Sequence, residues 1–594
     1  MIIIIPIGGI GQRFKENGYK KPKALINIYG KSIISYLLDN LNTDNIDYIF
    51  IPYNKEYKHY RFEDLLINNY PKINFKFLCL ENNTRGAAET INIGINNLNE
   101  ERDVPVLCLD SDNFYTCDII SQWNGENCIF SFEDKNENPI YSYVKTNEND
   151  EILDIKEKEK ISNNACTGAY GFRSMNKLKK YTSKIIEENI TQKSEFYTSG
   201  VIKAMISEGQ TFKNKTILYS NFICLGTPLQ LKCFYNSYPC KNCCNNEIVI
   251  KNKRICFDLD NTLVTFPTIR NEYTSVKPIK KNIDFLKYLK RFGNTIIIYT
   301  ARRMKTHNGN IGKINSDIGK ITFATLDKFD IPYDELYFGK PYADFYIDDL
   351  ALNCFDDLEK ELGYYDNKIE PRDFHTINMS SINTIIKNGD LKGETYYYEN
   401  IPKSLKDLFP IYLSGNNNTI TIEKINGLTV TDLYLSKMLN EKILINILNS
   451  ITRIQNCDII SDDINLYENY ASKLINRYKN YDYSLFENSE GAYESILVKL
   501  QYYEKNNLGK KKVIHGDPVF TNIIINNYGK IKFIDMRGKV GDKLTIYGDW
   551  LYDWAKIYQS IIGYDEILLS KFIDKMYKEN IIDIFKNYFF NKFS

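Results

Sequence analysis

The sequence lacks an excess of charge of either sign. Lysine and arginine together number 76, against 75 aspartate and glutamate residues, which leaves a formal net charge of +1. A basic excess would indicate attraction to nucleic acid, and an acidic excess would indicate a solvating tail. The balance gives no reason to expect a nucleic-acid partner.

Long apolar runs are also missing. The apolar stretch at residues 2–5 ends at Pro6, has no charged lead-in and is followed by glycines. It is too short for a signal peptide or a membrane span, and no later run is long enough to cross a bilayer. We therefore expect a cytoplasmic protein with no membrane partner.

The 13 cysteines lack the spacing of a disulfide framework. Without an export signal, they are expected to be reduced thiols. The one cluster is Cys240-x-x-Cys243-Cys244, and it lacks the second C-x-x-C or nearby histidine that would complete four zinc ligands. A solvated turn between domains is the favoured interpretation, and a metal site is the alternative.

At 594 residues the chain is too long for a single hydrophobic core. We predict a multidomain α/β protein with domains at residues 1–235, 254–366 and 367–594. Residues 236–253, which are dense in asparagine and lysine, are predicted to be a linker.

The first domain opens on a strand and a glycine loop. The isoleucines at residues 2–5 predict a strand buried on both faces. At Gly8, Gly9 and Gly11 the backbone can approach a phosphate without an intervening side chain. Arg13 and Lys23 bring positive charge to the same place. A buried strand with a plain glycine-rich turn is the alternative.

Apolar runs at residues 48–51, 75–80 and 104–109 alternate with helical stretches and predict a mostly parallel sheet. Asp110 and Asp112 follow the last run. Carboxylates at the C-terminal edge of such a sheet lie where ligands bind, and their oxygens suit Mg²⁺. A polar strand end without a metal is the alternative.

The glycine loop with R-F, G-Y and P-K behind it resembles the sugar-phosphate nucleotidyltransferases, and the resemblance covers the whole first domain. It implies that the turn around Gly86 recognises the base and that Glu157, Lys158 and Gly168 hold the phosphorylated substrate. In thymidylyltransferase-like members an aspartate that shares the metal stands where this sequence has Cys224.

The implied chemistry follows from charge. A substrate phosphate attacks the α-phosphate of an NTP, with CTP the expected nucleotide, and the two anions repel each other. Arg13, Lys23, Lys158 and Mg²⁺ would neutralise them while pyrophosphate leaves. A phosphate monoester is already a nucleophile near pH 7, so no general base is required.

The second domain opens on a short apolar strand and D-x-D-x-T, which resembles the haloacid dehalogenase-like phosphatases. By that resemblance Asp258 is the nucleophile that forms an aspartyl-phosphate, and Asp260 is the general acid and base. Thr300, at the end of a buried strand, would bind phosphate. Lys340 would steady the nucleophile and the phosphate.

A further short strand is predicted at residues 345–347 of this domain. It ends in Asp348 and Asp349, which by the same resemblance hold Mg²⁺ together with Asp258 and Asp260. Arg302 is expected to contact substrate, with a solvated basic turn as the alternative. The domain has no room for a large cap, and its motifs are similar to those of small capsule-biosynthesis phosphatases.

In the third domain H-G-D-x-x-x-x-N is followed by a strand and an aspartate. This pattern resembles the aminoglycoside- and choline-kinase-like phosphotransferases and implies a two-lobed, protein-kinase-like α+β fold. Asp517 would be the catalytic base, and Asn522 and Asp535 would hold Mg²⁺. His515 would brace the loop.

The sequence signal for the first lobe of this domain is weaker than that for the second. The strand around Lys387 resembles the one that carries the ATP-phosphate lysine, and Glu394 is its candidate helix partner. A surface lysine is the alternative interpretation of Lys387.

Together the resemblances imply an enzyme that uses ATP, a second NTP and Mg²⁺ to make a nucleotide-activated sugar or polyol for surface glycans. Its partners would be nucleotides and sugar or alcohol phosphates, and its oligomeric state is left open. One alternative is CDP-amino-alcohol or CDP-polyol synthesis with a choline-like kinase. Another is that one domain binds nucleotide without turnover.

Overall fold

The computed structural model describes residues 1–135, 139–237, 252–365, 375–381, 384–458, 463–526, 529–569 and 572–593. The chain divides into two compact units, Met1–Asp134 with Pro139–Asn367, and mainly Lys368–Ser594. In the first unit we distinguish an N-terminal part, residues 1–237, from a middle part, residues 252–365. Cys240, Cys243 and Cys244 lie outside the described residues. No described helix is long and apolar enough to cross a membrane.

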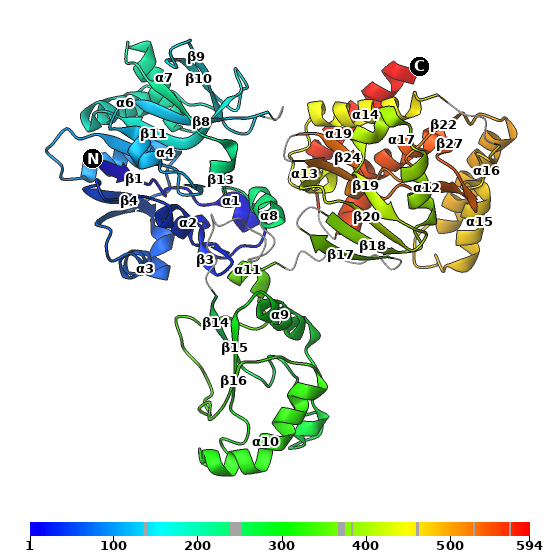
Figure 1. Ribbon diagram of the computed structural model, residues 1–594, viewed down its shortest axis with the longest axis horizontal. Coiled ribbons are helices and arrows are strands. Elements are labelled where there is room, and N and C mark those ends of the chain that lie inside the picture. The colour runs from blue at the N-terminus through cyan, green and yellow to red at the C-terminus, as the bar shows by residue number, and fades with distance from the viewer. Residues whose placement is uncertain are drawn as a thin grey trace. The chain divides into compact units, whose positions relative to one another are not determined.

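A sheet of mixed direction forms the centre of the N-terminal part (Figure 1). Its order is β10-β9-β11-β6-β1-β4-β5, with β8 beside β11 and β12 beside β8. The parallel strands β6, β1, β4 and β5 confirm the predicted parallel sheet, while β11 runs antiparallel to β6. The strands of this part are β1 Ile2–Ile4, β2 Asn27–Ile28, β3 Lys31–Ser32, β4 Tyr48–Asn54, β5 Phe75–Leu80, β6 Val106–Leu109, β7 Asn113–Tyr115, β8 Cys128–Glu133, β9 Ser142–Thr146, β10 Ile152–Glu157, β11 Asn164–Phe172, β12 Lys213–Thr216 and β13 Phe222–Cys224.

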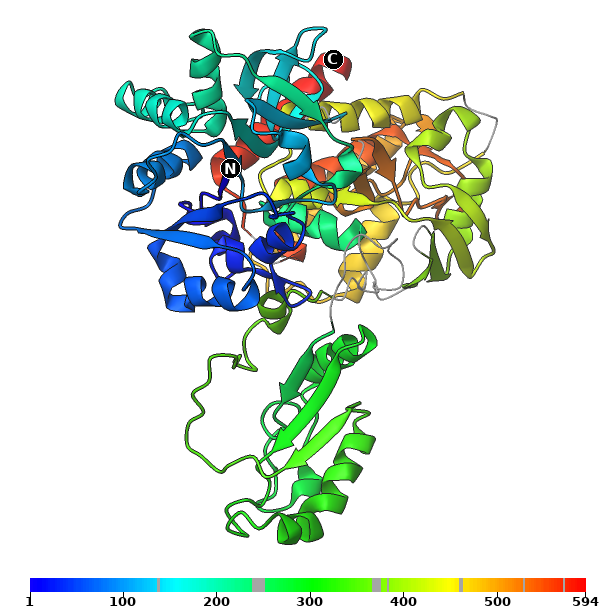
Figure 2. The same ribbon diagram turned by 60° about the vertical axis from the view of Figure 1, so that its left-hand side comes forward.

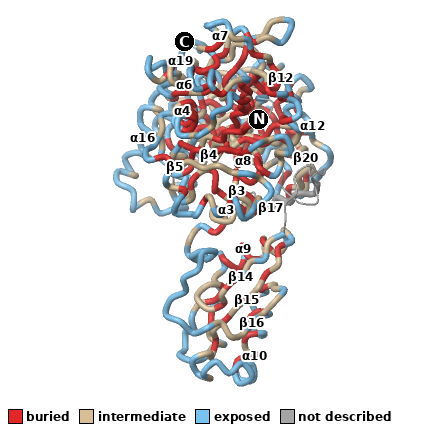
Figure 3. The backbone as a smooth tube through the Cα atoms, turned by 90° about the vertical axis from the view of Figure 1, so that its left-hand side faces the viewer, coloured by how far each residue is buried: buried red, intermediate tan, exposed pale blue. Residues whose placement is uncertain are grey.

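The strand β1 is buried on both faces, as its isoleucines predict. Ile2, Ile3, Ile4 and Ile5 are each 0% exposed. Ile3 and Ile5 belong to one hydrophobic cluster and Ile2 and Ile4 to another, because successive side chains of a strand point to opposite faces. Figure 3 shows buried residues, in red, running through this part of the chain.

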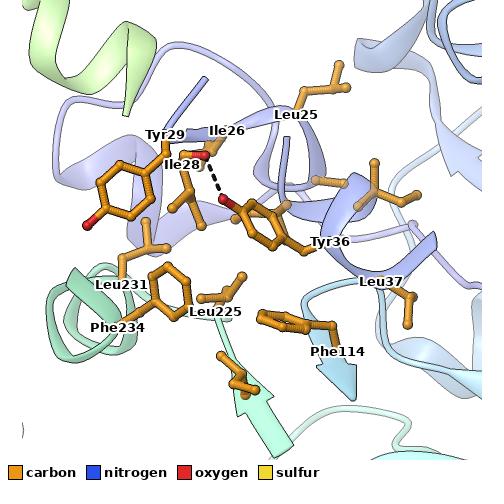
Figure 4. Packing of buried hydrophobic residues seen from close by; sticks show 14 of the residues in the cluster. Leu25, Ile26, Ile28, Tyr29, Tyr36, Leu37, Phe114, Leu225, Leu231 and Phe234 are labelled. Atoms are coloured by element: carbon orange, nitrogen blue, oxygen red, sulfur yellow. Dashed lines mark hydrogen bonds between the residues drawn. The ribbon is translucent and has the colours of Figure 1, made fainter. Parts of the chain in front are cut away.

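Helices supply the other side of each cluster. Buried side chains of α2, α3 and α5 join the cluster that contains Ile3, and those of α4, α6 and α7 join the one that contains Ile2. Figure 4 shows part of the first cluster, where the Tyr36 hydroxyl donates a 2.9 Å hydrogen bond to the carbonyl of Ile28. The helices are α1 Gln12–Glu16, α2 Ile33–Asp39, α3 Phe62–Asn69, α4 Ala87–Asn97, α5 Ile119–Trp123, α6 Met175–Glu187, α7 Thr198–Ser207 and α8 Pro228–Ser237.

The middle part is built on a parallel sheet in the order β14-β15-β16. The strand predicted at residues 345–347 is not formed, so that prediction is wrong for this structure. Residues 339–357 contain no helix or strand, as the segment leaving β16 in Figure 2 shows, and none of the described strands forms a ladder with them. The elements are β14 Arg254–Phe257, α9 Lys280–Arg291, β15 Thr295–Thr300, α10 Ile311–Lys328, β16 Glu335–Phe338 and α11 Leu358–Leu362.

The end of the middle part packs against the β2–β3 hairpin. The backbone N–H of Tyr29 donates to the carbonyl of Gly363 at 2.7 Å. Gly363 has a φ of +68°, and a Cβ there would lie 1.9 Å from the carbonyl oxygen of Asn27. Only glycine fits this close approach. Around it, the N-terminal and middle parts share one hydrophobic cluster.

The second unit begins with an antiparallel sheet in the order β17-β18-β20-β19, and a mostly helical region follows it. Two short hairpins and the β22–β27 pair lie within that helical region. The strands are β17 His375–Ser381, β18 Thr384–Gly389, β19 Tyr412–Gly415, β20 Thr419–Glu423, β21 Gly427–Thr429, β22 Lys511–Val513, β23 Ile523–Asn526, β24 Ile531–Phe533, β25 Lys539–Val540, β26 Lys543–Leu544 and β27 Tyr547–Asp549. The helices are α12 Lys392–Asn400, α13 Val430–Leu435, α14 Glu441–Gln455, α15 Ala471–Asn480, α16 Ser489–Lys505, α17 Trp550–Gln559, α18 Asp565–Leu568 and α19 Lys575–Phe593.

Candidate active sites

The strand order of the N-terminal part reverses between β1 and β6. From β1 the chain continues to β4 and β5 on one side, and then returns to β6 on the other. In open α/β sheets, ligands bind at the C-terminal ends of strands where the order reverses in this way. The glycine loop follows β1, and Asp110 and Asp112 follow β6. Both predicted elements therefore lie at the switch point.

The loop after β1 is tightly packed at one glycine and open at the next. A Cβ on Gly8 would lie 2.2 Å from the hydroxyl oxygen of Thr90 and 2.3 Å from that of Thr84. Gly11 has a φ of +63°, which favours glycine. Gly9 is exposed, and a Cβ there would meet nothing within 4 Å. A ligand can approach the backbone at Gly9.

Lys23 and two aspartates form the charged centre of this site. Lys23 Nζ lies 2.5 Å from Asp112 Oδ2. Burial lowers the pKa of Lys23, but the charge of Asp112 and its hydrogen bond outweigh that effect, so the pKa is raised overall. Burial and the charge of Asp112 raise the pKa of Asp110 to about 8, against the opposing effect of Lys23. A cation bound here would relieve this unfavourable negative charge.

Two predicted substrate-binding residues lie on the same side of the site. Glu157 accepts a 3.2 Å hydrogen bond from the hydroxyl of Ser199. Lys158 Nζ donates to the hydroxyl of Tyr197 at 3.0 Å. Burial raises the pKa of Tyr197, and Arg13 is close enough to oppose that rise. Tyr197 therefore lies beside Lys158 and within electrostatic reach of Arg13.

Two glycines make room for the carboxylates. A Cβ on Gly168, whose φ is +80°, would lie 2.4 Å from Asp110 Oδ2, and a Cβ on Gly226 would lie 2.3 Å from Asp112 Oδ2. Cys224 is next to this pair, and burial, with Asp112, raises the pKa of its thiol. Because a neutral thiol supplies no charge, Asp110 and Asp112 are the carboxylates suited to hold Mg²⁺.

The turn at Gly86 is fixed by contacts with the segment that precedes α7. A Cβ on Gly86 would lie 2.4 Å from the carbonyl oxygen of Phe196. The Arg85 guanidinium lies 4.6 Å from the centre of the Phe196 ring and pairs with Glu89 at 2.6 Å. These contacts hold the turn that was predicted to recognise the base.

Residues 2–214 match the family model described as nucleotidyl transferase. This part of the chain is a nucleotidyl transferase domain. Its activity class is therefore nucleotidyl transfer. No curated protein matched the chain.

Three solved structures were among those similar to the chain. The nucleoside-diphosphate-sugar pyrophosphorylase from Vibrio cholerae RC9 is 20% identical over 39% of this chain and 99% of its own, with a TM-score of 0.36. CTP:phosphocholine cytidylyltransferase from Streptococcus pneumoniae is 15% identical over 39% and 97%, with a TM-score of 0.32. The inositol-1-phosphate CTP transferase from T. maritima is 14% identical over 39% and 90%, with a TM-score of 0.32. Scores this low add no argument to the nucleotidyl transferase match.

In the middle part, the ends of β14 and β15 bring together a lysine, a threonine and an aspartate. Lys340 Nζ lies 3.1 Å from Asp258 Oδ2, and the backbone N–H of Lys340 donates to the carbonyl of Thr300 at 3.2 Å. Thr300 is fully buried. The lysine is therefore held against the aspartate that is predicted to be the nucleophile.

Arg302 is buried against Asp260 and not directed at a substrate. Its side chain is 0% exposed, and Nε and Nη2 each donate to Asp260 at 2.8 Å. Burial raises the pKa of Asp260 and Arg302 opposes that rise. The predicted substrate contact is thus replaced by a positioning role. A sequence displays the charge of Arg302 but not its desolvation.

Asp348 and Asp349 are both exposed and lie in the segment without regular structure. The neighbouring apolar side chains are also in solvent, with Phe345 85% and Ile347 100% exposed. The structure therefore does not assemble the predicted four-aspartate metal site. Among the described residues, no three His, Cys, Asp or Glu side chains converge to hold a metal ion.

In the second unit, Lys387 of β18 is buried between two carboxylates. Its Nζ lies 2.5 Å from Glu394 Oε2 on α12 and 2.6 Å from Asp535 Oδ1. Burial raises the pKa of Glu394 to about 7, with Lys387 opposing. The structure therefore favours the predicted lysine–glutamate pair over the alternative of a surface lysine.

The hairpin of β23 and β24 explains how Asn522 and Asp535 come together. Asn522 directly precedes β23, Asp535 follows β24, and the N–H of Ile534 donates to the carbonyl of Asn522 at 3.0 Å. The Asn522 amide also donates to the carbonyl of Asp517 at 2.9 Å. Amide and carboxylate oxygens suit Mg²⁺, so Asn522 and Asp535 are side chains of this hairpin that fit such an ion.

Buried polar groups fix the loop that carries Asp517. His515 accepts from the N–H of Asp517 at 3.1 Å through Nδ1, so its Nε2 donates to the carbonyl of Ile534 at 3.0 Å. Burial lowers the pKa of His515 to about 4, which keeps the ring neutral. Asp553 on α17 accepts from the N–H groups of His515 and Gly516, both at 2.8 Å. Asp517 is therefore held in one geometry.

Proposed function

We propose that this chain is a multifunctional enzyme that makes a nucleotide-activated sugar or polyol. The observation that supports this proposal most strongly is the charged centre at the β1–β6 switch point of the nucleotidyl transferase domain. Lys23, Asp110 and Asp112 face the glycine loop there. Two further clusters suited to phosphate chemistry on the same chain support a sequence of reactions. The expected product would feed surface glycan synthesis.

In the nucleotidyl transfer step, a phosphate monoester attacks the α-phosphate of CTP and pyrophosphate leaves. Lys23, Arg13 and Lys158 carry the positive charge that binds and orients the two anionic substrates. Mg²⁺, when held by Asp110 and Asp112, supplies further charge for the leaving phosphates. The exposed backbone at Gly9 would contact the nucleotide phosphates.

We assign the kinase step to residues 367–594. Lys387, aligned by Glu394, would bind phosphates of ATP, and Asp517 would accept the proton of the acceptor hydroxyl. Asn522 and Asp535 would hold Mg²⁺, which neutralises charge on the transferring phosphate. The support is the burial of the Lys387 ammonium group between Glu394 and Asp535.

We assign the phosphatase step to residues 254–366. The pairs Lys340–Asp258 and Arg302–Asp260 support a nucleophile and an acid/base group held two residues apart. This step also requires Asp348 and Asp349 to approach Asp258. Among the described strands β14 pairs only with β15, so its other edge could accept the exposed segment at residues 345–347. Pairing there would bury side chains now in solvent.

The test of the transferase assignment is pyrophosphate release from CTP, UTP, GTP, dTTP or ATP with a panel of sugar and alcohol phosphates. Lys23→Met should abolish this release of pyrophosphate. Lys20→Met, which replaces an exposed lysine of the same loop, should retain it. If no pair releases pyrophosphate, the assignment is wrong.

The other two steps have separate tests. Asp258→Asn should abolish hydrolysis of phosphorylated candidates, and unchanged hydrolysis would contradict the phosphatase assignment. Asp517→Asn should abolish acceptor-dependent ATP consumption, whereas Asp542→Asn, an exposed control, should not. Equal activity of these two variants would contradict the kinase assignment.

A further inference from the structure

Four cationic side chains gather beside Asp517 in the second unit. Lys473 and Arg477 are one turn apart on α15, Lys556 lies on α17, and Arg537 follows the β23–β24 hairpin. Residues four apart on a helix share a face, so both α15 cations can point to the same place.

Tyr552 holds two of the cations in position. Arg537 Nη1 donates to the Tyr552 hydroxyl at 2.8 Å, and the guanidinium lies 5.0 Å from the ring centre. Lys556 Nζ lies 6.0 Å from the same ring centre and 3.1 Å from Asp517 Oδ1. Lys556 therefore pairs with the carboxylate that is proposed to receive the acceptor proton, and Arg537 contacts the same tyrosine as Lys556.

Two contacts position α15 and Arg537 relative to the loop that carries Asp517. The Tyr470 ring, just before α15, lies 6.1 Å from the Tyr552 ring. The N–H of Arg537 donates to the carbonyl of His515 at 3.1 Å, next to the loop of Asp517. The positions of α15 and Arg537 relative to Asp517 are thus fixed by packing and by a backbone hydrogen bond.

The charges in the cluster do not cancel. Burial and the charges of Arg537, Arg477 and Lys556 together lower the pKa of Lys473 to about 8, against the opposing effect of Asp517. Within the described residues, Lys473 and Arg537 form no ion pair with a carboxylate. A choline-like or amino-alcohol cation would be repelled here, whereas an anion would be attracted.

We propose that the acceptor of the kinase site is an alcohol that already carries a phosphate or carboxylate group, bound by Lys473, Arg477 and Arg537. The proposal rests on the proposed kinase function. The acceptor oxygen forms a bond to the γ-phosphorus of ATP while the bond from that phosphorus to the bridging oxygen breaks. The acceptor proton passes to Asp517, and ADP leaves.

A phosphorylated acceptor would place the kinase before the phosphatase. The kinase product would carry two phosphates, and removal of the one used for recognition would leave a monoester. A phosphate monoester is the class of compound that attacks an NTP in nucleotidyl transfer. The anionic acceptor would thereby give the phosphatase a substrate.

The first test is ATP consumption by the full chain with matched acceptors: glycerol, glycerol 3-phosphate, D-glycerate, ribitol, ribitol 5-phosphate, glucose, glucose 6-phosphate, ethanolamine and choline. Anionic members are expected to be used with a kcat/KM at least tenfold higher than their neutral counterparts. Preference for a neutral or cationic alcohol would overturn the proposal. No consumption with any acceptor would instead count against the kinase function itself.

The second test needs no turnover. Reductive methylation followed by mass spectrometry should modify Lys473 faster than Lys479, an exposed lysine of the same helix, because the pKa of Lys473 is lowered. Glycerol 3-phosphate, ribitol 5-phosphate or inorganic phosphate should slow the methylation of Lys473 but not of Lys479. If none of them protects Lys473, the anion site is refuted whether or not the kinase is active.

Variants separate recognition from chemistry. Lys473→Met and Arg537→Met should each raise the KM for the anionic acceptor about 10- to 100-fold, the usual effect of losing a hydrogen bond to a charged group. Lys479→Met should leave it unchanged. A fall in kcat without a rise in KM would indicate a structural role and contradict the proposal.

Discussion

Arg302→Met should destabilise the middle part by an amount that depends on pH. Arg302 is completely buried, whereas the side chain of Asp260 is 17% exposed, and two of the hydrogen bonds between them are 2.8 Å long. Removing one partner of a buried ion pair costs about 3–5 kcal/mol, because the other charge is left uncompensated. Since Asp260 retains some contact with water, we expect the lower end, about 3 kcal/mol, at pH 8.

The sign of the pH dependence follows from Asp260. Burial already raises its pKa above the unfolded value, and loss of Arg302 would raise it further. When folding raises the pKa of a carboxyl, the protein loses stability as the pH rises from the unfolded to the folded pKa of that group. It regains this stability on acidification. The difference between wild type and variant should therefore shrink by about 1.4 kcal/mol per unit as the pH falls below the Asp260 pKa of the variant.

The assay is urea unfolding of the full chain at pH 5 and pH 8, followed by pulsed hydrogen exchange of β15 peptides at one labelling pH. This readout isolates the middle part of a chain that does not unfold in a single step. Arg303→Met is the matched control, because Arg303 pairs with Asp317 at 3.4 Å near the surface, and it should cost at most about 1 kcal/mol. An equal loss in both variants, or a loss independent of pH, would refute the reasoning.

Three further predictions concern the other sites. Lys23→Met should lower the rate of pyrophosphate release about 100- to 1000-fold, because it removes positive charge from the transferred phosphates; a loss below about tenfold would contradict its role. Glu394→Gln should raise the KM for ATP, because Lys387 loses one of its two charged partners. Steady-state kinetics would detect this, with Glu399→Gln on the same helix as the control. Gly363→Ala should destabilise the contact with the β2–β3 hairpin by about 1–3 kcal/mol, because a Cβ cannot fit there; unchanged hydrogen exchange of the hairpin would contradict the packing argument.

The sequence was most informative where one short segment contained both the structural and the chemical signal. The isoleucines before Gly8 fixed a doubly buried strand, because a run of apolar residues is needed when both faces are covered. Lys387 and Glu394 were predicted as partners from the resemblance of their segment to the phosphotransferases, and the structure places them 2.5 Å apart. Such local patterns determine local structure almost by themselves.

The sequence was less informative where the environment came from distant elements. The burial of Arg302 depends on packing that its neighbours in sequence do not reveal. Tyr197 meets Lys158 only because α7 and β10 pack together. The apolar alternation at residues 345–347 predicted a strand, but a strand also requires a partner, and none of the described strands pairs with these residues.

The most direct test of the account is a single reaction of the full chain with ATP, CTP, Mg²⁺ and the acceptor panel, followed by ³¹P NMR. We predict that ADP, inorganic phosphate, pyrophosphate and a new pyrophosphate-linked nucleotide appear together with one acceptor. Lys23→Met should stop only the formation of the linked nucleotide and pyrophosphate. Failure to form a linked nucleotide with every acceptor and with every NTP put in place of CTP would contradict the central claim.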